Sequence, residues 1–234
     1  MGTFVIKGRP TWLGSLDISQ IAHIAAIDYQ AEALDNTVLS DTTRSNAGGL
    51  KVVGFSCDAY ADFTTYDATL FGTVGDALPV SFASVDGTAY EDAYLFNARH
   101  LQYNPITGTV GDMAGVNITG GAAGKIAKGV IEFNASASSS STSAGSQLGA
   151  LSATQSLFAN LHVTAQAGTS LDVIVQSDDN GSFTSATNRI TFTQATGVTN
   201  EHLSVAGAIT DDYWRLSYTI VGGSFTFAAA IGIA

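Results

Sequence analysis

The sequence predicts an all-β protein, and two observations support that fold class. Apolar and polar residues alternate in short segments along the whole chain, and each segment is bounded by Gly, Asn, Asp, Ser or Thr. This period of two is typical of strands that bury one face, whereas the spacing of an amphipathic helix is almost absent. Charged residues make up only 12% of the chain, about half the usual share, which leaves few side chains for solvated helix faces.

Ten segments follow the alternation, and in two of them both faces can be assigned. In residues 157–166 the odd-numbered positions are apolar, whereas the even-numbered positions from Asn160 to Gln166 are polar. In residues 213–220 Trp214 and the other even-numbered positions are apolar, so we expect Trp214 to face the core. The ten expected strands are residues 24–29, 50–60, 79–84, 93–103, 129–137, 157–166, 171–176, 189–194, 213–220 and 225–231.

The segments between these strands contain two short helix candidates and several loops. Residues 16–23 could form a helix capped by Asp17 or Ser15, and residues 152–158 begin with Ser152 and Gln155 at capping-box spacing but overlap an expected strand. Asp178-Asp179-Asn180-Gly181 predicts a tight turn, because Asn-Gly tolerates positive φ. The serine-rich tract 136–146 has nothing to bury and predicts a mobile connection or a surface loop.

A weak internal sequence repeat suggests how the chain is organised into domains. Residues 48–56 and 127–134 each place small residues and a lysine ahead of an alternating strand, which a duplicated barrel would explain and which chance in a glycine-rich β protein would explain as well. We therefore expect an N-terminal β region over 1–128 with an extended loop near 32–49, and a C-terminal β region over 129–234, unless the two form one continuous domain.

Charge and cysteine content exclude several classes of protein. The net charge is -11 and the pI is near 4.4, which argues against a grip on nucleic acid phosphates and against binding to a membrane surface. The single cysteine, Cys57, permits no internal disulfide. The first residues, Met1 to Lys7, lack the pattern of a secretory signal, so we expect an unprocessed chain that is synthesised and assembled in the cytoplasm.

The search for catalytic or metal-binding residues predicts no enzyme, no cofactor and no metal. The histidines His23, His100, His162 and His202 are not at metal-ligand spacing from one another or from Cys57, and His100 and His162 are expected to be solvated or at an interface. No nucleophile elbow occurs. Residues 119–126 resemble a phosphate-binding loop only superficially, because Thr119 and Ile126 replace its first glycine and its hydroxyl.

Other motifs favour structural readings. Asp178-Asp179 and Asp211-Asp212 lack the alternating ligands of a calcium loop, and solvated turns are the better reading. The glycosylation patterns at Asn117, Asn134 and Asn180 read as accidental in a chain so rich in Ser and Thr.

Three stretches of sequence resemble the tail tube (major tail) proteins of long-tailed bacteriophages. The first contains Leu16-Asp17-Ile18-Ser19, residues 29–35 and residues 41–51, and closes at Ala61-Asp62-Phe63. The second is residues 93–99, which lead through Tyr103-Asn104-Pro105 to residues 108–112. The third is residues 157–163, then residues 171–179 and finally Asp212-Tyr213-Trp214-Arg215-Leu216. Together the stretches cover most of the chain.

The resemblance implies a β-sandwich or barrel subunit whose strands join those of neighbouring copies. Such subunits form six-fold or pseudo-six-fold rings that stack into the tube through which DNA passes without specific binding. It implies a virion protein with the tape measure, tail tip and tail terminator as partners, no membrane, and no catalytic, cofactor-binding or metal residues. Low charge fits surface that copies bury, and loops 32–49 and 111–124 fit arms that a neighbour orders. The acidic chain predicts a net negative lumen.

Two other functions fit the same composition. One is a different β-structured virion protein, such as a decoration or tail-completion subunit. The other is a carbohydrate-binding β-sandwich module, which the two tryptophans and eight tyrosines would suit. Sedimentation separates them, because tubes or rings favour the tail tube and a lasting monomer with glycan affinity favours the carbohydrate-binding module.

Overall fold

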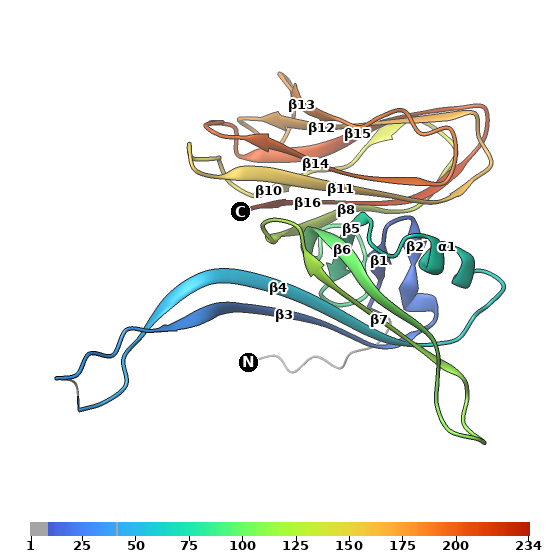
Figure 1. The fold of residues 1–234 in the computed structure, drawn as a ribbon. Helices are drawn as coiled ribbons and strands as arrows, with labels where there is room; N and C mark the ends of the chain where they lie inside the picture. Colours follow the sequence, from blue (N-terminus) through green and yellow to red (C-terminus); the bar gives the residue numbers. More distant parts are fainter. Residues whose placement is uncertain (1–8, 41) are drawn as a thin grey trace. The chain divides into compact units, whose positions relative to one another are not determined.

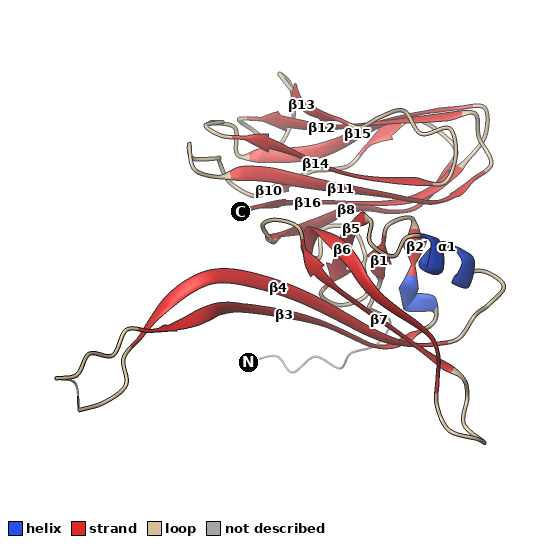
Figure 2. Ribbon diagram, viewed as in Figure 1, coloured by secondary structure: helices blue, strands red, loops and turns tan. Residues whose placement is uncertain are grey.

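The computed structural model describes residues 9–40 and 42–234, and strands dominate them (Figures 1 and 2). Strands hold 60% of the residues and helices 4%, so the all-β expectation is confirmed. Lys7 at the amino-terminal end and the loop residue Asp41 lie outside the described residues. The chain divides into two compact units: unit 1 consists of Met1–Ile21, Ala77–Ala98 and Ala123–Ala234, and unit 2 of Ala22–Asp76 and Arg99–Ala122.

The division into units differs from the expected boundary between residues 128 and 129. That boundary falls inside strand β8 (Ala127–Ala137), and unit 2 is inserted into unit 1 twice. Strand β6 (Asp92–Thr107) contributes residues to both units. A contiguous split could not reveal this arrangement, because sheet pairing joins segments that are far apart in the sequence.

Unit 1 contains two antiparallel sheets. The larger follows the order β14–β11–β16–β8–β6–β5–β1–β2, and the smaller the order β10–β15–β12–β13 with β9 also on β15. The remaining strands of unit 1 are β1 (Thr11–Leu13), β2 (Leu16–Asp17), β5 (Ala77–Ala83), β9 (Ser141–Thr142), β10 (Ser146–Gln147), β11 (Ser156–Gln166), β12 (Ser170–Asp178), β13 (Thr187–Thr191), β14 (Thr199–Ala206), β15 (Tyr213–Val221) and β16 (Phe225–Ile233).

The main core of unit 1 lies between these two sheets. Leu157 and Leu161 of β11 meet Trp214 and Leu216 of β15 in one buried cluster, so both assigned faces are confirmed. The Trp214 indole Nε1 donates to the Gly149 carbonyl at 2.9 Å, which satisfies its polar atom inside the core.

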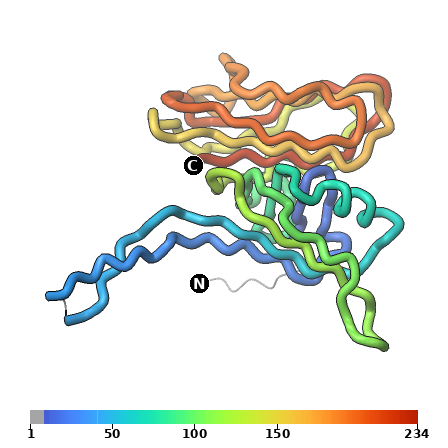
Figure 3. Tube along the Cα trace, viewed as in Figure 1, coloured from blue at the N-terminus to red at the C-terminus, as the bar shows by residue number. Residues whose placement is uncertain are grey.

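Unit 2 is built on one antiparallel sheet and one helix. Its strands are β3 (Ala22–Asp35), β4 (Asn46–Tyr60), β7 (Gly115–Ala122) and the second half of β6, in the order β3–β4–β7–β6. Helix α1 (Asp67–Gly72) follows β4. The hairpins β3–β4 and β6–β7 extend in different directions (Figure 3).

All ten expected strands are present, but several further strands were not predicted. Strands β7 and β14 and the short β1 and β2 lie in segments with too few apolar residues for a clear alternation. The expected loops are shorter than predicted, because 32–35 and 46–49 belong to β3 and β4 and 115–122 forms β7. Pairing with neighbouring strands keeps these residues extended.

The helix candidates had mixed outcomes. Residues 18–20 form a 3-10 helix (Ile18–Gln20), and Asp17 caps it by accepting from the Ser19 N–H at 3.1 Å. The candidate at 152–158 is wrong, because β11 begins at Ser156; the amide oxygen of Gln155 still accepts from the Ser152 N–H at 3.0 Å. Helix α1 was not predicted, since six residues are too few to show a helical period.

Two loops also differ from expectation. The serine-rich tract lies along β15, where the Ser143 hydroxyl is buried and accepts from the Leu216 N–H at 2.9 Å. At the 178–181 turn the positive φ occurs at Phe183 and not at Asn180-Gly181. Asp178 accepts from the Ser185 N–H at 2.8 Å instead, so side-chain hydrogen bonds shape this connection.

Candidate functional site

The sheet of unit 2 has one apolar face. Val53, Phe55, Cys57 and Ala59 of β4 point to this face and are buried, and β7 adds Val116 and Ile118. Gly120 of β7 is paired with Phe55, and a Cβ at Gly120 would come within 2.2 Å of the Phe55 ring. The first half of the glycine-rich stretch 119–126 therefore belongs to β7, where Gly120 makes room for an aromatic ring, and residues 123–126 form the loop that follows.

On the described residues of β3, β4 and β7, the opposite face of this sheet mixes polar with small and apolar residues and carries no basic residue. The paired register places Asp28 beside Gly54, Ser56 beside Thr119, and Asp58 beside Asn117. The Asn117 amide donates to Asp58 Oδ1 at 2.6 Å. The described residues that the register puts on this face are Ile24, Ala26, Asp28, Gln30, Val52, Gly54, Ser56, Asp58, Tyr60, Gly115, Asn117, Thr119 and Gly121. Its charge is negative, because it carries two aspartates and no lysine or arginine.

Strand β3 forms an open edge of this sheet. It is 14 residues long and, among the described strands, pairs only with β4. An antiparallel edge strand presents a row of backbone N–H and C=O groups that another strand can pair with. Beyond His100, whose backbone exchanges hydrogen bonds with Gly75 and Asp76, β6 forms the other edge of the same sheet within unit 2.

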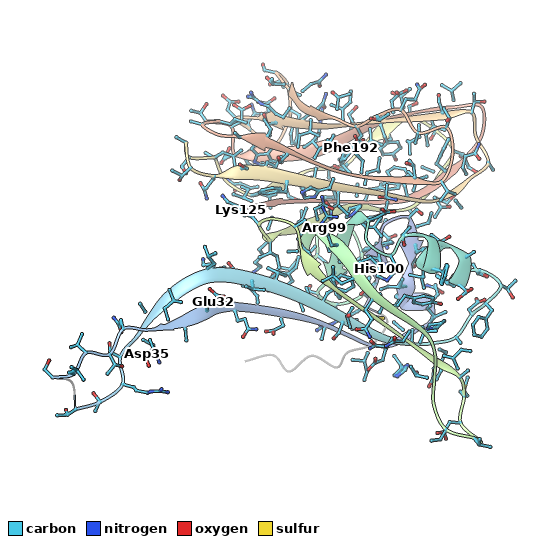
Figure 4. All side chains as sticks on the ribbon, viewed as in Figure 1. Glu32, Asp35, Arg99, His100, Lys125 and Phe192 are labelled. Atoms are coloured by element: carbon cyan, nitrogen blue, oxygen red, sulfur yellow. The ribbon has the colours of Figure 1, made fainter. Side chains whose placement is uncertain are left out.

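The end of the β3–β4 hairpin, residues 30–52, is a projecting arm. Every described residue of the arm except Gly49 is exposed, and Figure 4 shows Glu32 and Asp35 along it. The loop at its tip is closed by hydrogen bonds, since the Asn36 N–H donates to the Ser45 carbonyl at 3.0 Å and the Ser45 N–H donates to Thr37 Oγ1 at 3.0 Å. The arm therefore holds its hairpin shape although neither of its faces is covered.

Exposed apolar side chains are concentrated in unit 2. Among the described residues, fifteen of the nineteen large exposed apolar side chains belong to it, and the four in unit 1 are Tyr90, Tyr94, Val198 and Val221. In the arm they are Leu34, Val38, Leu39, Leu50 and Val52; near α1 they are Phe63, Phe71 and Val74; on the β6–β7 hairpin they are Leu101, Ile106, Val110 and Met113. Unit 2 also exposes Ile24, Tyr29 and Tyr60.

The buried polar residues of unit 2 attach helix α1 to β6. The Tyr103 hydroxyl donates to Asp67 Oδ1 at 2.8 Å, and burial with the nearby carboxylate raises the pKa of Tyr103. His100 is buried with Nδ1 3.3 Å from Thr73 Oγ1, so the expectation that it is solvated or at an interface is wrong (Figure 4). Burial lowers the pKa of His100, so the ring is neutral and structural.

The candidate reactive groups occupy structural positions. Burial raises the pKa of the Cys57 thiol to about 12, which keeps it protonated and poorly nucleophilic. His162 is fully buried in unit 1, so the expectation that it is solvated is wrong as well. Among the described residues, no group of three His, Cys, Asp or Glu side chains could hold a metal ion, and no helix is long and apolar enough to cross a membrane.

The two acidic pairs are tied to neighbouring side chains and backbone. Asp211 accepts from Ser177 at 2.6 Å and from Arg189 at 2.9 Å, and these hydrogen bonds lower its pKa. Asp178 is held by the Ser185 N–H and by Asn180. These contacts favour structural roles at the two positions.

Comparison with known proteins gives weak similarity in structure alone. No family model and no curated protein matches the sequence. A chain from the virion of a native gene transfer agent particle matches 50% of this chain and 93% of its own length, with a TM-score of 0.39 and 16% identity. A chain from the tail of an empty gene transfer agent particle of C6 symmetry matches 45% of this chain and 80% of its own, with a TM-score of 0.36 and 16% identity.

A third similar structure covers nearly the whole chain. It is the Dit protein of phage SPP1, described as a paradigm of the hub adsorption apparatus in phages that infect Gram-positive bacteria. The match covers 97% of this chain and all of the other, with a TM-score of 0.36 and 8% identity. With TM-scores below 0.5 and identities of 16% or less, these similarities assign no role to the chain.

Proposed function

We propose that this chain is a structural subunit of a phage tail and assembles with copies of itself into stacked rings that form the tail tube. The observation that carries the proposal is the sheet of unit 2, which combines a long unpaired edge with an exposed apolar arm. The sequence resemblance to tail tube proteins supports the same assignment.

The two edges of this sheet suit a closed ring. If β3 of one copy pairs with the second half of β6 of the next, the contact is heterologous and repeats around a rotation axis. Backbone hydrogen bonds across such a contact need no particular side chains, so the poor alternation of β3 is no obstacle. Ring closure also removes the unpaired edge.

The arm suits contacts between rings. Leu39 is fully exposed, and Leu34 and Leu50 are more than half exposed. Burying one such side chain stabilises an interface by about 1.5–3 kcal/mol. Several arms per ring would therefore make stacking favourable, and the arm's own hydrogen bonds limit the entropy lost on docking.

The polar face of the sheet suits the channel wall. Asp28 and Asp58 repel phosphates, and the β3, β4 and β7 positions of this face carry no lysine or arginine that could make a salt-dependent contact. DNA would pass through without specific binding. In this role the chain needs no catalytic group, cofactor or metal. It resides in the virion. The faces of its rings meet the tape measure, tail tip and tail terminator proteins.

Sedimentation velocity and negative-stain images of the purified chain test the proposal. We expect closed rings or tubes from the natural chain and monomers from Ala26→Lys, which places a charge on the exposed β3 edge. Thr219→Lys, on an exposed position of β15 in unit 1, is the matched control and should still assemble.

The other outcomes point to the other functions. Single rings that never stack would instead favour a hub, decoration or tail-completion subunit. A lasting monomer that binds glycans would favour the carbohydrate-binding module. Normal tubes from Ala26→Lys would reject the β3 edge as the ring contact.

A further inference from the structure

Unit 1 contains a buried polar cluster on the outer side of its sandwich. Asn160 and His162 of β11 point away from the sandwich core, and both are 0% exposed. They are covered by strands from the beginning of the chain and by β5: Trp12 of β1 stacks on the His162 ring with centroids 5.9 Å apart. The polar face of β11 is therefore a second interior surface.

Hydrogen bonds connect this cluster into a chain of four side chains that ends on a backbone carbonyl. His202 Nδ1 lies 2.6 Å from Asn160 Oδ1, and Asn160 Nδ2 donates to Ser81 Oγ at 3.0 Å and to the Val80 carbonyl at 2.8 Å. His162 Nε2 lies 2.8 Å from Ser81 Oγ, and His162 Nδ1 lies 2.6 Å from the Gly14 carbonyl.

One placement of the hydrogens satisfies every member of the chain. His162 carries its proton on Nδ1 and donates to Gly14, because a carbonyl can only accept. Its Nε2 then accepts from the Ser81 hydroxyl, whose oxygen accepts from Asn160, whose own oxygen accepts from His202. A neutral His162 is the form that completes this arrangement.

The cluster joins strands that no backbone ladder connects. Among the described residues β11 pairs with β14 and β16, whereas β1 and β5 pair with each other and with β2 and β6. Besides the hydrogen-bonded chain, a small apolar cluster of Trp12, Ala83, Ala93, Ile131, Ala228 and Ala230 fills this layer. Side-chain hydrogen bonds therefore hold β1 and β5 against β11, whereas backbone pairing holds neighbouring strands together elsewhere in the sheet.

Few titratable groups face His162 from the packed strands. Strands β1, β5 and β16 carry none. Strand β14 carries His202, which is in the chain, and Glu201, which accepts from the Thr193 N–H at 2.8 Å. Strand β2 carries Asp17, which caps the 3-10 helix. The ring nitrogens of His162 lie within hydrogen-bond distance of the Gly14 carbonyl and the Ser81 hydroxyl and of no carboxylate among the described residues, so a proton on Nε2 would gain no counter-ion within bonding distance.

We propose that this cluster is an acid-sensitive latch that holds β1 and β5 on β11 at neutral pH and loosens them when His162 takes up a proton. A protonated Nε2 becomes a donor, so the Ser81 hydroxyl hydrogen loses its acceptor and a charge is buried. Burial already lowers the pKa of His162 to about 4 and lowers that of His202, so the latch is closed at neutral pH. The latch does not depend on the proposed function.

Hydrogen exchange of the full chain at pH 7 and pH 5, corrected for intrinsic rates, tests the latch. Two reporter amides are Gly14, which donates to the Pro79 carbonyl at 2.9 Å, and Ala83, which donates to the Pro10 carbonyl at 3.1 Å. With a pKa of about 4 in the closed form and 6.5 in the open form, their protection should fall about 20-fold between pH 7 and pH 5. Amides of the β12–β15 ladder should change far less.

Two variants separate the latch from general acid weakening. His162→Gln cannot titrate, so its reporter amides should lose the pH dependence, whereas His23→Gln, at an exposed position of unit 2, should retain it. Reporter protection in the natural chain that does not change with pH would overturn the latch, and so would an unchanged pH dependence in His162→Gln.

A direct measurement covers the case in which His162→Gln does not fold. The imidazole signals of His162 in the natural chain should not titrate above about pH 5 while the fold persists. The latch would be rejected if His162 titrated near its ordinary pKa of 6.5 while the amides of β1 and β5 stayed protected from exchange, because the closed form would then tolerate the charge.

Discussion

In unit 1 the large apolar side chains lie between packed layers of strands, whereas in unit 2 most of them lie at the surface. Trp214, Phe225 and Phe227 are at most 1% exposed, but Phe71, Leu50 and Ile106 are each more than 70% exposed. The units share antiparallel pairing and similar residue types, so composition does not explain the difference. Unit 1 has a second sheet to cover its core, and unit 2 has one sheet and a six-residue helix. Unit 2 is therefore the part that a neighbouring copy would complete.

The largest expected contrast is the cost of removing one aromatic ring from each unit. Trp214→Ala should lower the free energy of unfolding by about 3–5 kcal/mol, because it leaves a cavity and an unpaired Gly149 carbonyl. Phe71→Ala should change it by less than about 0.5 kcal/mol. Urea denaturation in the Ala26→Lys background keeps both variants unassembled. Equal losses of unfolding free energy in Trp214→Ala and Phe71→Ala would contradict the contrast between the units.

The next contrast is the acid sensitivity of unit 1. The pKa of His162 is about 4 in the fold and 6.5 in the unfolded chain. Its contribution to stability is therefore complete above about pH 6.5 and is lost as the pH falls toward 4. Between pH 7 and pH 5 the loss should be about 2 kcal/mol. Urea midpoints of the natural chain and of His162→Gln should converge at pH 5, and parallel curves would show that His162 does not carry the effect.

A smaller effect on stability, with a large effect on assembly, is expected in the arm. Changing Leu34, Leu39 and Leu50 together to Ser should alter monomer stability by less than about 0.5 kcal/mol, because these side chains are exposed. Stacked tubes should be lost while single rings remain. Thr42→Ala, at an exposed position of the same arm, should leave the tubes unchanged. Normal tubes from the triple variant would remove the arm from the stacking contact.

The smallest expected signal is DNA binding. Assembled natural protein should not bind duplex DNA at low or physiological salt, because the proposed channel face carries Asp28 and Asp58 and no basic residue on β3, β4 or β7. Ser56→Lys with Thr119→Lys, on the inner strands β4 and β7 of that face and away from the β3 edge, should create salt-dependent binding if that face lines the channel. The matched change Thr219→Lys in unit 1 should not. Binding by the natural protein would argue against an acidic channel.

The sequence predicted the strands whose alternation is strong, and it missed those that depend on partners. Residues 157–166 and 213–220 were placed on the correct faces because one side of each strand meets a core. Strand β7 was missed because its glycines fit against Phe55, a contact that no local pattern shows. The β3 edge and the arm were expected only as a loop, since their extended form comes from pairing with β4.

The sequence alone was enough to predict an all-β chain, a core containing Trp214 and a net negative charge. These follow from alternation, residue types and spacing, which are local properties of the chain. Only the tertiary structure decided that His162 is buried, that unit 2 is inserted twice into unit 1, and that exposed apolar side chains gather on unit 2. The physical reason is that burial depends on what lies above a strand face. A polar position on β11 is solvated if that face is open and satisfied internally if β1 and β5 cover it.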